Sequence, residues 1–263
     1  MVLFSVLTVT KNNITGLART MESLQSQSFH DWEWVVVDGV SVDGSQELLQ
    51  SSGLPLTLLS EPDSGIYDAM NKATRLASGV YVVYLNAGDR LALPNTLETV
   101  AKVVQQAGLA KPAMIFGGAT FITASGKSYY DRKPRNCFSY IARGLPAVHQ
   151  ATYFRRAALS RDPYDVSYRV CGDYALVASL VASRPSVAYV EDSLALFDTN
   201  GVSSRHPIVL LSESMRVRRD VLHLGWVWRV VLTARVAIRW AFSRIAASIS
   251  HSRGSSSSVH TRS

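Results

Sequence analysis

Polar side chains, several of them acidic, follow four short apolar segments within the first ninety residues. They are Thr10 and Asn12 after the first segment, Asp38 and Gly39 after the second, Asp63 and Gly65 after the third, and Asn86, Gly88 and Asp89 after the fourth. Any one acid at such a place is as readily a turn or helix cap. Three acids with adjacent glycines indicate instead a pocket that binds a polar ligand.

Two common glycine-rich phosphate-binding motifs are missing from the sequence. G-x-G-x-x-G does not follow the first apolar segment, and Gly126-Lys127-Ser128 only imitates the end of G-x-x-x-x-G-K-[ST], because Phe121 stands where the first glycine belongs. A carboxylate-lined pocket without such a loop needs a cation to hold a diphosphate, and Mg²⁺ or Mn²⁺ bridges hard oxygens in this way. The residues therefore predict a metal-dependent nucleotide site.

The elements that must position these residues alternate between strands and helices. Strands are expected at Phe4–Val9, Trp32–Val37, Leu56–Leu59 and Val80–Leu85, and helices at Ile14–Gln27, Ser45–Gln50, Ile66–Ala77 and Thr96–Ala107. This order predicts right-handed crossovers and an α/β fold with a mostly parallel sheet. Because ligands bind outside the carboxyl ends of parallel strands, the polar residues above should meet at one edge.

The pattern loosens after residue 113 and is typical of a mixed α+β half. We expect strands at Met114–Thr123, Ala151–Phe154, Val187–Val190 and Leu194–Phe197, a helix at Tyr174–Ala182, a turn at Ser125–Gly126 and an irregular connection over 127–150. A nucleotide-binding half of about 1–123 and a second half of about 124–205 follow from this change.

Composition limits the class of protein. The 263 residues are 47% hydrophobic and 18% charged, which suits one large globular domain with an appendage. Cys137 and Cys171 lack metal-ligand spacing and are expected as buried thiols. The chain starts directly with an expected strand, and no apolar run approaches the ~20 residues of a membrane span, so a cytoplasmic protein is expected. The net charge of +7 does not by itself choose a partner.

Four segments in order resemble family 2 glycosyltransferases of the GT-A fold: Phe4–Asn13, Val35–Ser45, Glu61–Lys72 and Leu85–Asp89. The resemblance continues through His149–Arg156 and Tyr168–Tyr174 to Gly201–Ser204, and it is closest to bacterial enzymes that build exopolysaccharide units and glycolipids. It implies a Rossmann-like, mostly parallel sheet, a GT-A domain over 1–205 whose second half binds the acceptor, and C-terminal amphipathic helices. The implied activity is transfer of a hexosyl group from a nucleotide sugar.

The resemblance also implies roles for the residues of the nucleotide half. Thr10 and Asn12 would border the nucleoside, Asp38 would hydrogen-bond the base, Asp63 would complete that pocket, and Gly65 would allow close approach of the backbone. Since Asp38 can pair with uracil or guanine, the donor is expected to be UDP- or GDP-linked.

The D-x-D motif of the family falls at Asn86–Asp89, where only the last acid is kept. Asp89 is therefore the expected ligand of Mg²⁺ or Mn²⁺, and Asn86 is expected to contact the ribose or to support the metal ligand. The loss of one acid also leaves open weak or dispensable metal binding.

Asp173 corresponds to the general base of the family, which takes the acceptor proton as oxygen attacks the anomeric carbon. Single-step displacement predicts inversion at that carbon. The alternative for Asp173 is an N-cap of the helix that follows. His149 and Gln150 match a motif on the acceptor side, where either residue would orient a sugar hydroxyl. A buried, hydrogen-bonded histidine is the alternative for His149.

The C-terminal segment 206–250 is expected to contain a basic amphipathic helix from Trp226 to Ile245, followed by a disordered tail at 251–263. Val227, Val230, Val231, Ala234 and Ile238 repeat at spacings of three and four, with arginines on the other side and tryptophans near the boundary. The helix either lies on an anionic membrane surface or packs its apolar stripe on the domain. The first alternative predicts a lipid-linked saccharide acceptor and a peripheral location on the inner face of the cytoplasmic membrane.

The resulting hypothesis is an inverting glycosyltransferase that needs no nucleic acid. Two alternatives remain open at this point. A sugar nucleotidyltransferase would have a related fold, although Thr10–Asn13 does not supply the glycine-rich basic loop such enzymes carry after the first strand. A non-catalytic, membrane-associated binding protein would have kept the fold without the activity.

Overall fold

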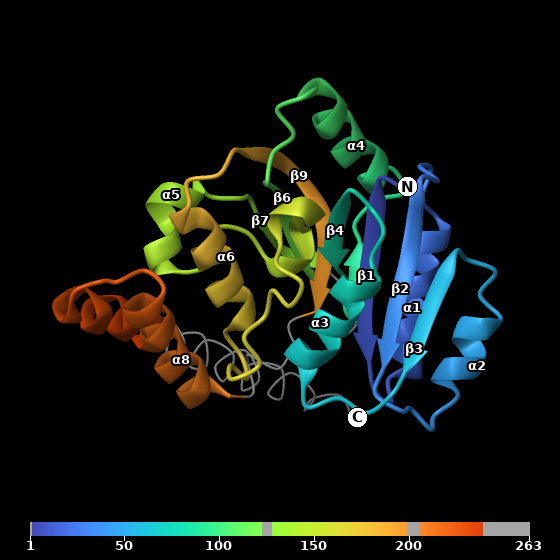
Figure 1. The fold of residues 1–263 in the computed structure, drawn as a ribbon, viewed down its shortest axis with the longest axis horizontal. Coiled ribbons are helices and arrows are strands. Elements are labelled where there is room, and N and C mark those ends of the chain that lie inside the picture. The colour runs from blue at the N-terminus through green and yellow to red at the C-terminus, as the bar shows by residue number, and fades with distance from the viewer. Residues whose placement is uncertain (1, 123–127, 199–205, 239–263) are drawn as a thin grey trace, which may run out of the picture.

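The computed structural model describes residues 2–122, 128–198 and 206–238. Within these ranges, nine strands form a single sheet that runs across the molecule, with helices packed on both faces (Figure 1). Two hydrophobic clusters lie on opposite faces of the sheet. Helices α3 (Ile66–Leu76) and α6 (Gly172–Ala182) contribute to one cluster, while α1 (Ile14–Gln25), α2 (Ser45–Gln50) and α4 (Thr96–Gln106) contribute to the other.

The first half is a parallel sheet in the order β3–β2–β1–β4. Its strands are β1 (Phe4–Thr10), β2 (Trp32–Asp38), β3 (Leu56–Ser60) and β4 (Tyr81–Tyr84), so all four predicted strands are confirmed, as are the four helices. Alternate residues of each strand enter opposite clusters: Phe4 and Val6 face one and Leu7 and Val9 the other. Burial on both faces explains the uninterrupted apolar runs.

The second half extends the sheet with strands of mixed direction, in the order β4–β8–β6–β9–β5, and β7 pairs with β6. The strands are β5 (Arg90–Leu91), β6 (Met114–Ile122), β7 (Ser128–Arg132), β8 (Thr152–Arg155) and β9 (Val187–Asp198). Strand β8 is antiparallel to β4 and β6, whereas β6 and β9 are parallel. The expected mixed α+β half is confirmed.

Two expectations for this half need correction. The connection 127–150 contains β7, α5 (Cys137–Tyr140) and short 3₁₀ helices at Ile141–Arg143 and His149–Ala151. The two strands expected between 187 and 197 are one strand, β9, whose register against β6 shifts around Gly118. A Cβ at Gly118 would lie 2.6 Å from the Glu191 carbonyl oxygen, so the irregular pairing requires glycine. The turn expected at Ser125–Gly126 lies outside the described residues.

Helix α8 (Pro207–Asp220) and a further helix over residues 226–238 follow the sheet. They lie beside α6, at the end of the molecule far from β3 (Figure 1). The second helix begins where the amphipathic helix was expected, and the expected tail at 251–263 lies outside the described residues. No helix in the described part of the chain is both long and apolar enough to cross a bilayer.

Candidate active site

The carboxyl ends of the first three strands lie side by side at one edge of the sheet, as was predicted from the polar residues that follow these strands. Thr10 is the register partner of Asp38, and Asp38 is the partner of Ser60. Asp63 joins this edge, because a Cβ built on Gly39 would lie 2.7 Å from Asp63 Oδ2. The loop of the fourth strand is tied to the same edge by Asn13, whose Nδ2 donates to the Ala87 carbonyl at 3.0 Å.

Asp38 is 0% exposed and organises the loop that follows β2. Its Oδ2 accepts from the Ser41 backbone N–H at 3.0 Å, from Gln46 Nε2 at 3.1 Å and from Ser60 Oγ at 2.9 Å. Its Oδ1 accepts from the Ser41 hydroxyl. Because both carboxylate oxygens have protein donors, a base can contact Asp38 directly only by replacing one of them.

Asn12 joins the loop after β1 to the loop after β2. Its backbone N–H donates to Ser41 Oγ at 2.8 Å, and its Oδ1 accepts from the Val42 N–H at 2.9 Å. The residue has φ of 49°, a left-handed conformation that asparagine tolerates better than most residues. Asn12 and Asp38 therefore share Ser41 as a partner and form one hydrogen-bonded unit.

Two buried oxygen atoms at the predicted site have no hydrogen-bond partner among the residues that the structure describes. They are Thr10 Oγ1 and Asn86 Oδ1. A buried polar atom without a partner costs about 1–3 kcal/mol, so such atoms call for an explanation. Their position at the ends of β1 and β4 fits residues that bind a polar ligand, as was expected for both.

Asp63 and Gly65 shape the loop before α3. Asp63 Oδ1 accepts from the Gly65 N–H at 2.9 Å, and Gly65 has φ of 136°, which a residue with a side chain adopts only with strain. Lys72 anchors this loop from one helical turn later, through Glu61 at 2.8 Å and the Pro62 carbonyl at 2.7 Å. Lys72 thus fixes the loop that carries Asp63 and Gly65.

Asp89 is 9% exposed and lies against the second half of the chain, because Gln150 Nε2 donates to its Oδ2 at 3.0 Å. The structure thus brings Gln150 to the expected metal ligand. Among the described residues, no three His, Cys, Asp or Glu side chains form a metal-binding group. One carboxylate with the nearby Asn86 amide fits a Mg²⁺ or Mn²⁺ ion whose other ligands are donor phosphates and water.

His149 is buried, and the alternative of a hydrogen-bonded core histidine describes it. Its Nε2 lies 2.8 Å from the Tyr164 hydroxyl, and its ring packs 5.0 Å from the Tyr84 ring. Burial lowers the pKa of His149 to about 3, so the imidazole is neutral at physiological pH. The Tyr164 ring stacks on Tyr67 at 5.4 Å, which continues the aromatic contact toward α6.

Asp173 lies in the first turn of α6, and the N-cap is Cys171, so the capping alternative for Asp173 is wrong. Burial raises the pKa of Asp173 to about 6; the backbone N–H groups of Tyr174 and Asp173 oppose this shift, and the charge of Glu213 adds to it. Oδ1 accepts from the Tyr174 N–H at 2.7 Å. A partly buried carboxyl whose pKa lies just below neutrality suits a general base.

The acidic side chains are connected through a chain of contacts. Asp89 binds Gln150, the neighbouring His149 binds Tyr164, and Tyr164 stacks on Tyr67. The charge of Asp173 raises the pKa of both tyrosines, although burial is the larger cause for each. Asp89, at the expected nucleotide edge, and Asp173, the expected base, are therefore both connected to Tyr67 and Tyr164.

Sequence reasoning missed several residues of this region: Gln46, Tyr67, Tyr164 and Glu213. The tyrosines belong to apolar patterns and resemble ordinary core residues. Glu213 carried a usable signal, because it is an acid on a helix whose other charged residues are arginines and a terminal aspartate. Its buried partners are backbone N–H groups, which no side-chain pattern reveals.

Comparisons with known proteins identify sequences that are similar to this chain. The family model described as glycosyl transferase family 2 matches residues 5–165. An uncharacterized glycosyltransferase of Mycobacterium tuberculosis is 28% identical over 223 residues, which cover 81% of this chain and 82% of that protein. A PGL/p-HBAD biosynthesis glycosyltransferase of Mycobacterium bovis is 29% identical over 177 residues, covering 65% and 67%.

Solved structures support the fold. TarS of S. aureus superposes with a TM-score of 0.65 at 17% identity, covering 92% of this chain and 73% of that chain. It has also been solved with UDP and with UDP-GlcNAc. The mannosyltransferase PcManGT of Pyrobaculum calidifontis, in complex with GDP-Man and Mn²⁺, has a TM-score of 0.58 at 18% identity, covering 95% and 79%.

Proposed function

We propose that this chain, which belongs to glycosyl transferase family 2, is an inverting enzyme that moves a hexosyl group from a UDP- or GDP-linked donor to an acceptor hydroxyl. That it is a glycosyltransferase with the GT-A fold follows from the family and from its structural neighbours. The observation that carries the finer proposal is Asp173, a carboxyl with a pKa raised to about 6 that adjoins the nucleotide edge.

The donor nucleotide is proposed to lie across the carboxyl ends of β1, β2 and β4. Thr10 Oγ1 and Asn86 Oδ1 would contact polar groups of the donor there, because neither atom has a hydrogen-bond partner in the described part of the chain. Asp63 and Gly65 would border the base from the loop before α3. Asp38 and Asn12 would act on the nucleoside through the loop that they hold together at Ser41.

Asp89 would hold the divalent cation together with the donor phosphates, and Gln150 would orient its carboxylate. When bound, Mg²⁺ or Mn²⁺ neutralises charge that grows on the departing diphosphate. The structural neighbour with GDP-Man contains Mn²⁺, which supports the type of ion.

Asp173 is proposed to accept the proton of the acceptor hydroxyl. As that oxygen bonds to the anomeric carbon, the bond from this carbon to the donor phosphate breaks and the nucleoside diphosphate leaves. Attack and departure on opposite faces invert the anomeric configuration. Since Asp173 must be ionised to accept a proton, the rate should fall as the pH drops through about 6.

The acceptor is proposed to be a lipid-linked saccharide of a cell-surface glycan, presented at the inner face of the cytoplasmic membrane. The role in PGL/p-HBAD biosynthesis belongs to the mycobacterial relative and supports this class of product. The apolar stripe of the 226–238 helix lies on the surface: Val227, Val231 and Ile238 are 51%, 42% and 54% exposed. Its partner side carries Leu232 and Thr233 instead.

Exposed apolar residues with tryptophans at their border suit a helix in the headgroup region of a bilayer. Trp226 and Trp228 are both largely exposed. The net charge of +7 favours anionic lipid. The exposure of the stripe argues against the alternative in which it packs on the domain.

A thermal-shift screen with nucleoside diphosphates, with and without Mn²⁺, tests the donor site. We expect stabilisation by UDP or GDP, since a ligand at about 100 times its Kd adds about 2.7 kcal/mol to the free energy of unfolding. Asp173→Asn should keep this shift and lose nearly all transfer. An Asp173→Asn enzyme with wild-type turnover would remove Asp173 from the base role, and no shift with any nucleotide would contradict the donor site.

A further inference from the structure

Glu213 of α8 binds the backbone that leads into the candidate base. Its Oε1 accepts from the Arg169 N–H at 2.8 Å, and its Oε2 accepts from the Val170 N–H at 2.9 Å and the Cys171 N–H at 2.8 Å. Glu213 is only 8% exposed. One carboxylate thus binds three successive amides that end two residues before Asp173.

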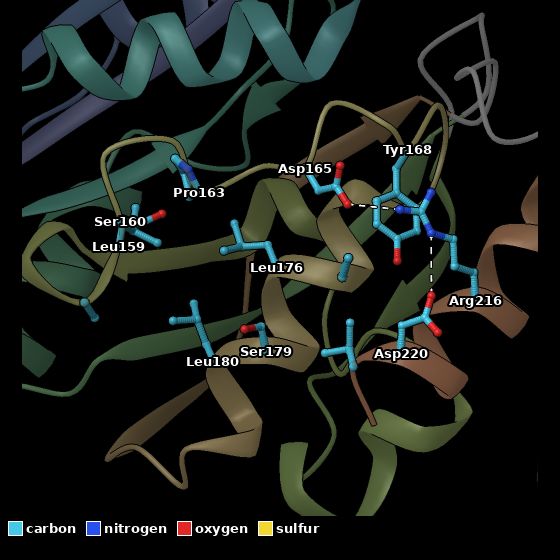
Figure 2. A pocket seen from close by; sticks show the side chains of 13 residues that line it. Leu159, Ser160, Pro163, Asp165, Tyr168, Leu176, Ser179, Leu180, Arg216 and Asp220 are labelled. Atoms are coloured by element: carbon cyan, nitrogen blue, oxygen red, sulfur yellow. Dashed lines mark hydrogen bonds and ion pairs between the residues drawn. The ribbon is translucent and has the colours of Figure 1, made fainter. Parts of the chain in front are cut away.

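Arg216, one turn further along α8, holds the beginning of the same segment. Its Nη2 lies 3.1 Å from Asp165 Oδ2 and 2.6 Å from Ser167 Oγ, and its guanidinium stands 4.1 Å from the centre of the Tyr168 ring. Figure 2 shows Arg216 reaching from α8 toward Asp165 and Tyr168, at one end of a cavity of about 440 Å³ whose other end is lined by Leu159 and Leu180. Glu213 and Arg216 are three residues apart, so one face of α8 grips residues 165–171 at both ends.

Each of the three amides donates its hydrogen bond to the Glu213 carboxylate. The N-cap residue Cys171 makes no side-chain cap hydrogen bond to α6. Without the Glu213 carboxylate, buried N–H groups would lose their acceptor, and the segment would rearrange to find another. Any such rearrangement moves the point from which the Asp173 side chain leaves the backbone.

We propose that Glu213 is a positioning residue for the transfer reaction, which fixes the 169–171 backbone and so aims the Asp173 carboxylate at the acceptor. This inference rests on the proposed role of Asp173 as base. Glu213 acts through Asp173 and does not touch the reacting atoms. It lies on α8, beyond the residues 5–165 that match the family.

The charge of Glu213 adds a second effect on Asp173. The ionisable groups whose charges interact with Asp173 come from several elements: Tyr67 on α3, Tyr164 in the preceding loop, Cys171 at the start of α6 and Glu213 on α8. Among these four groups, Glu213 is the one whose charge raises the pKa of Asp173. Removing it should therefore move the acid limb of the rate profile to lower pH.

The test compares Glu213→Gln with the wild-type enzyme under saturating donor and acceptor. Glutamine keeps the length of the side chain, but its NH₂ group faces a backbone donor that the carboxylate accepted. We expect kcat to fall 10- to 100-fold, as small displacements of a catalytic group do. The KM of the donor and the Kd of its nucleoside diphosphate should stay within twofold of the wild-type values, because the proposed nucleotide edge is formed by β1, β2 and β4 and not by α8.

Glu98→Gln is the matched control, since Glu98 lies on α4 and pairs only with exposed partners. It should have wild-type kcat and an unchanged pH profile. Asp173→Asn, measured in parallel, separates the two proposals. Turnover lost in Asp173→Asn but wild-type in Glu213→Gln would overturn the positioning role alone, whereas an active Asp173→Asn would overturn the proposed function.

Glu213→Asp serves as a second variant that keeps the charge and shortens the reach by one methylene. Reduced kcat with unchanged donor KM supports positioning by geometry, and it decides the question if Glu213→Gln does not fold. Wild-type kcat in the aspartate variant would overturn the proposal. So would the loss of folding in both variants, because Glu213 would then be a general stabilising residue.

Discussion

At the scale of single residues, the site separates acids that organise loops from the acid proposed to do chemistry. Asp38 is saturated by donors from Ser41, Gln46 and Ser60. Asp173 has one short backbone hydrogen bond and a pKa raised by burial. The two carboxylates therefore have opposite surroundings, which suit them to different roles.

Asp38 can be tested by comparing two substitutions. Asp38→Ala leaves the Ser41 N–H and the Ser60 hydroxyl without their acceptor, so the free energy of unfolding should fall by about 1–3 kcal/mol. Asp38→Asn keeps an oxygen for both donors and should cost less. We expect nucleotide affinity, measured by calorimetry, to be lost in Asp38→Ala and largely kept in Asp38→Asn. An asparagine variant with wild-type stability but no affinity would show a direct contact with the base.

Asp173 should reduce stability as the pH rises. Its pKa increases from an ordinary value of 3.8 to about 6 in the fold, so the folded state binds the proton more tightly, and stability falls between these values as pH increases. The Asp173→Asn variant has no carboxyl group at this position, so its stability does not fall in this way. Above pH 6 the free energy of unfolding of this variant should exceed that of the wild type by up to about 3 kcal/mol, because a shift of about two pKa units corresponds to 1.36 kcal/mol for each unit.

Urea denaturation at pH 4 and pH 7.5 checks this. The gain of the asparagine variant should be large at pH 7.5 and small at pH 4. A gain that is equal at both pH values, or absent at pH 7.5, would show that burial does not raise the pKa of Asp173.

Many positions of the candidate site could be predicted from the sequence. Thr10, Asn86 and Asp89 were placed by the rule that parallel strands end at one edge, and the structure puts them there. The partners of Asp38 were not foreseeable, because Gln46 and Ser60 reach it from a helix and a strand that are separate in sequence. Nor did composition distinguish a buried His149 from an exposed one.

At the scale of elements, the contact between α3 and the start of α6 sets the surroundings of Asp173, the proposed base. A Cβ at Gly172 would lie 2.7 Å from the ring of Tyr67, which is itself buried. Gly172 thus allows the two helices to approach closely beside Asp173. Helix α3 was predicted from its period, but this approach depends on the partner helix and not on either helix alone.

Gly172→Ala should push Tyr67 or the start of α6 aside. We expect a loss of about 1–3 kcal/mol in the free energy of unfolding, as for other overpacked sites, and a lower kcat. Gly225→Ala is the control, because a Cβ there meets nothing within 4 Å. Equal thermal midpoints and equal kcat for the two alanine variants would show that Tyr67 yields without cost.

The strands were easier to predict than the connections. Strands β1, β2 and β4 are buried on both faces, and their apolar runs identify them without knowledge of neighbours. Strand β7 exists because β6 pairs with it, and β9 continues through its irregular middle because β6 supplies partners on both sides. Such elements are fixed by tertiary pairing, which local patterns do not contain.

At the scale of the whole molecule, the exposed apolar stripe of the 226–238 helix gives the chain one face suited to a membrane. The same helix stays attached through Thr233, whose hydroxyl accepts from the buried Arg218 at 2.8 Å. The sequence identified the stripe but left open whether it faced the protein. In the structure, Leu232 and Arg229 lie on the side of the helix that packs inward, and the stripe lies on the other side.

Replacing Val231 and Ile238 together by aspartate should weaken binding to vesicles that contain anionic lipid. Each buried side chain of this size contributes about 1.5–3 kcal/mol, so partitioning should fall at least tenfold. Leu109→Asp, on a fully exposed loop residue after α4, is the control and should bind as the wild type does. Co-sedimentation with phosphatidylglycerol vesicles measures this.

Binding to those vesicles should also weaken as salt rises, because the positive charge is screened. Equal binding by the wild type and the double variant, or equal binding to neutral and anionic vesicles, would argue against this face.

The contacts of Glu213 and Arg216 on α8 with residues 165–171 have a consequence for chimeras between family members. A chimera that joined the first 205 residues of this chain to the C-terminal part of another family member would replace Glu213 by the residue which that member has at this place. Its nucleotide preference would be inherited intact, while its turnover would depend on whether the foreign helix presented a carboxylate to the same three amides. If Glu213 positions Asp173 as proposed, recombination should change catalytic speed without changing donor choice.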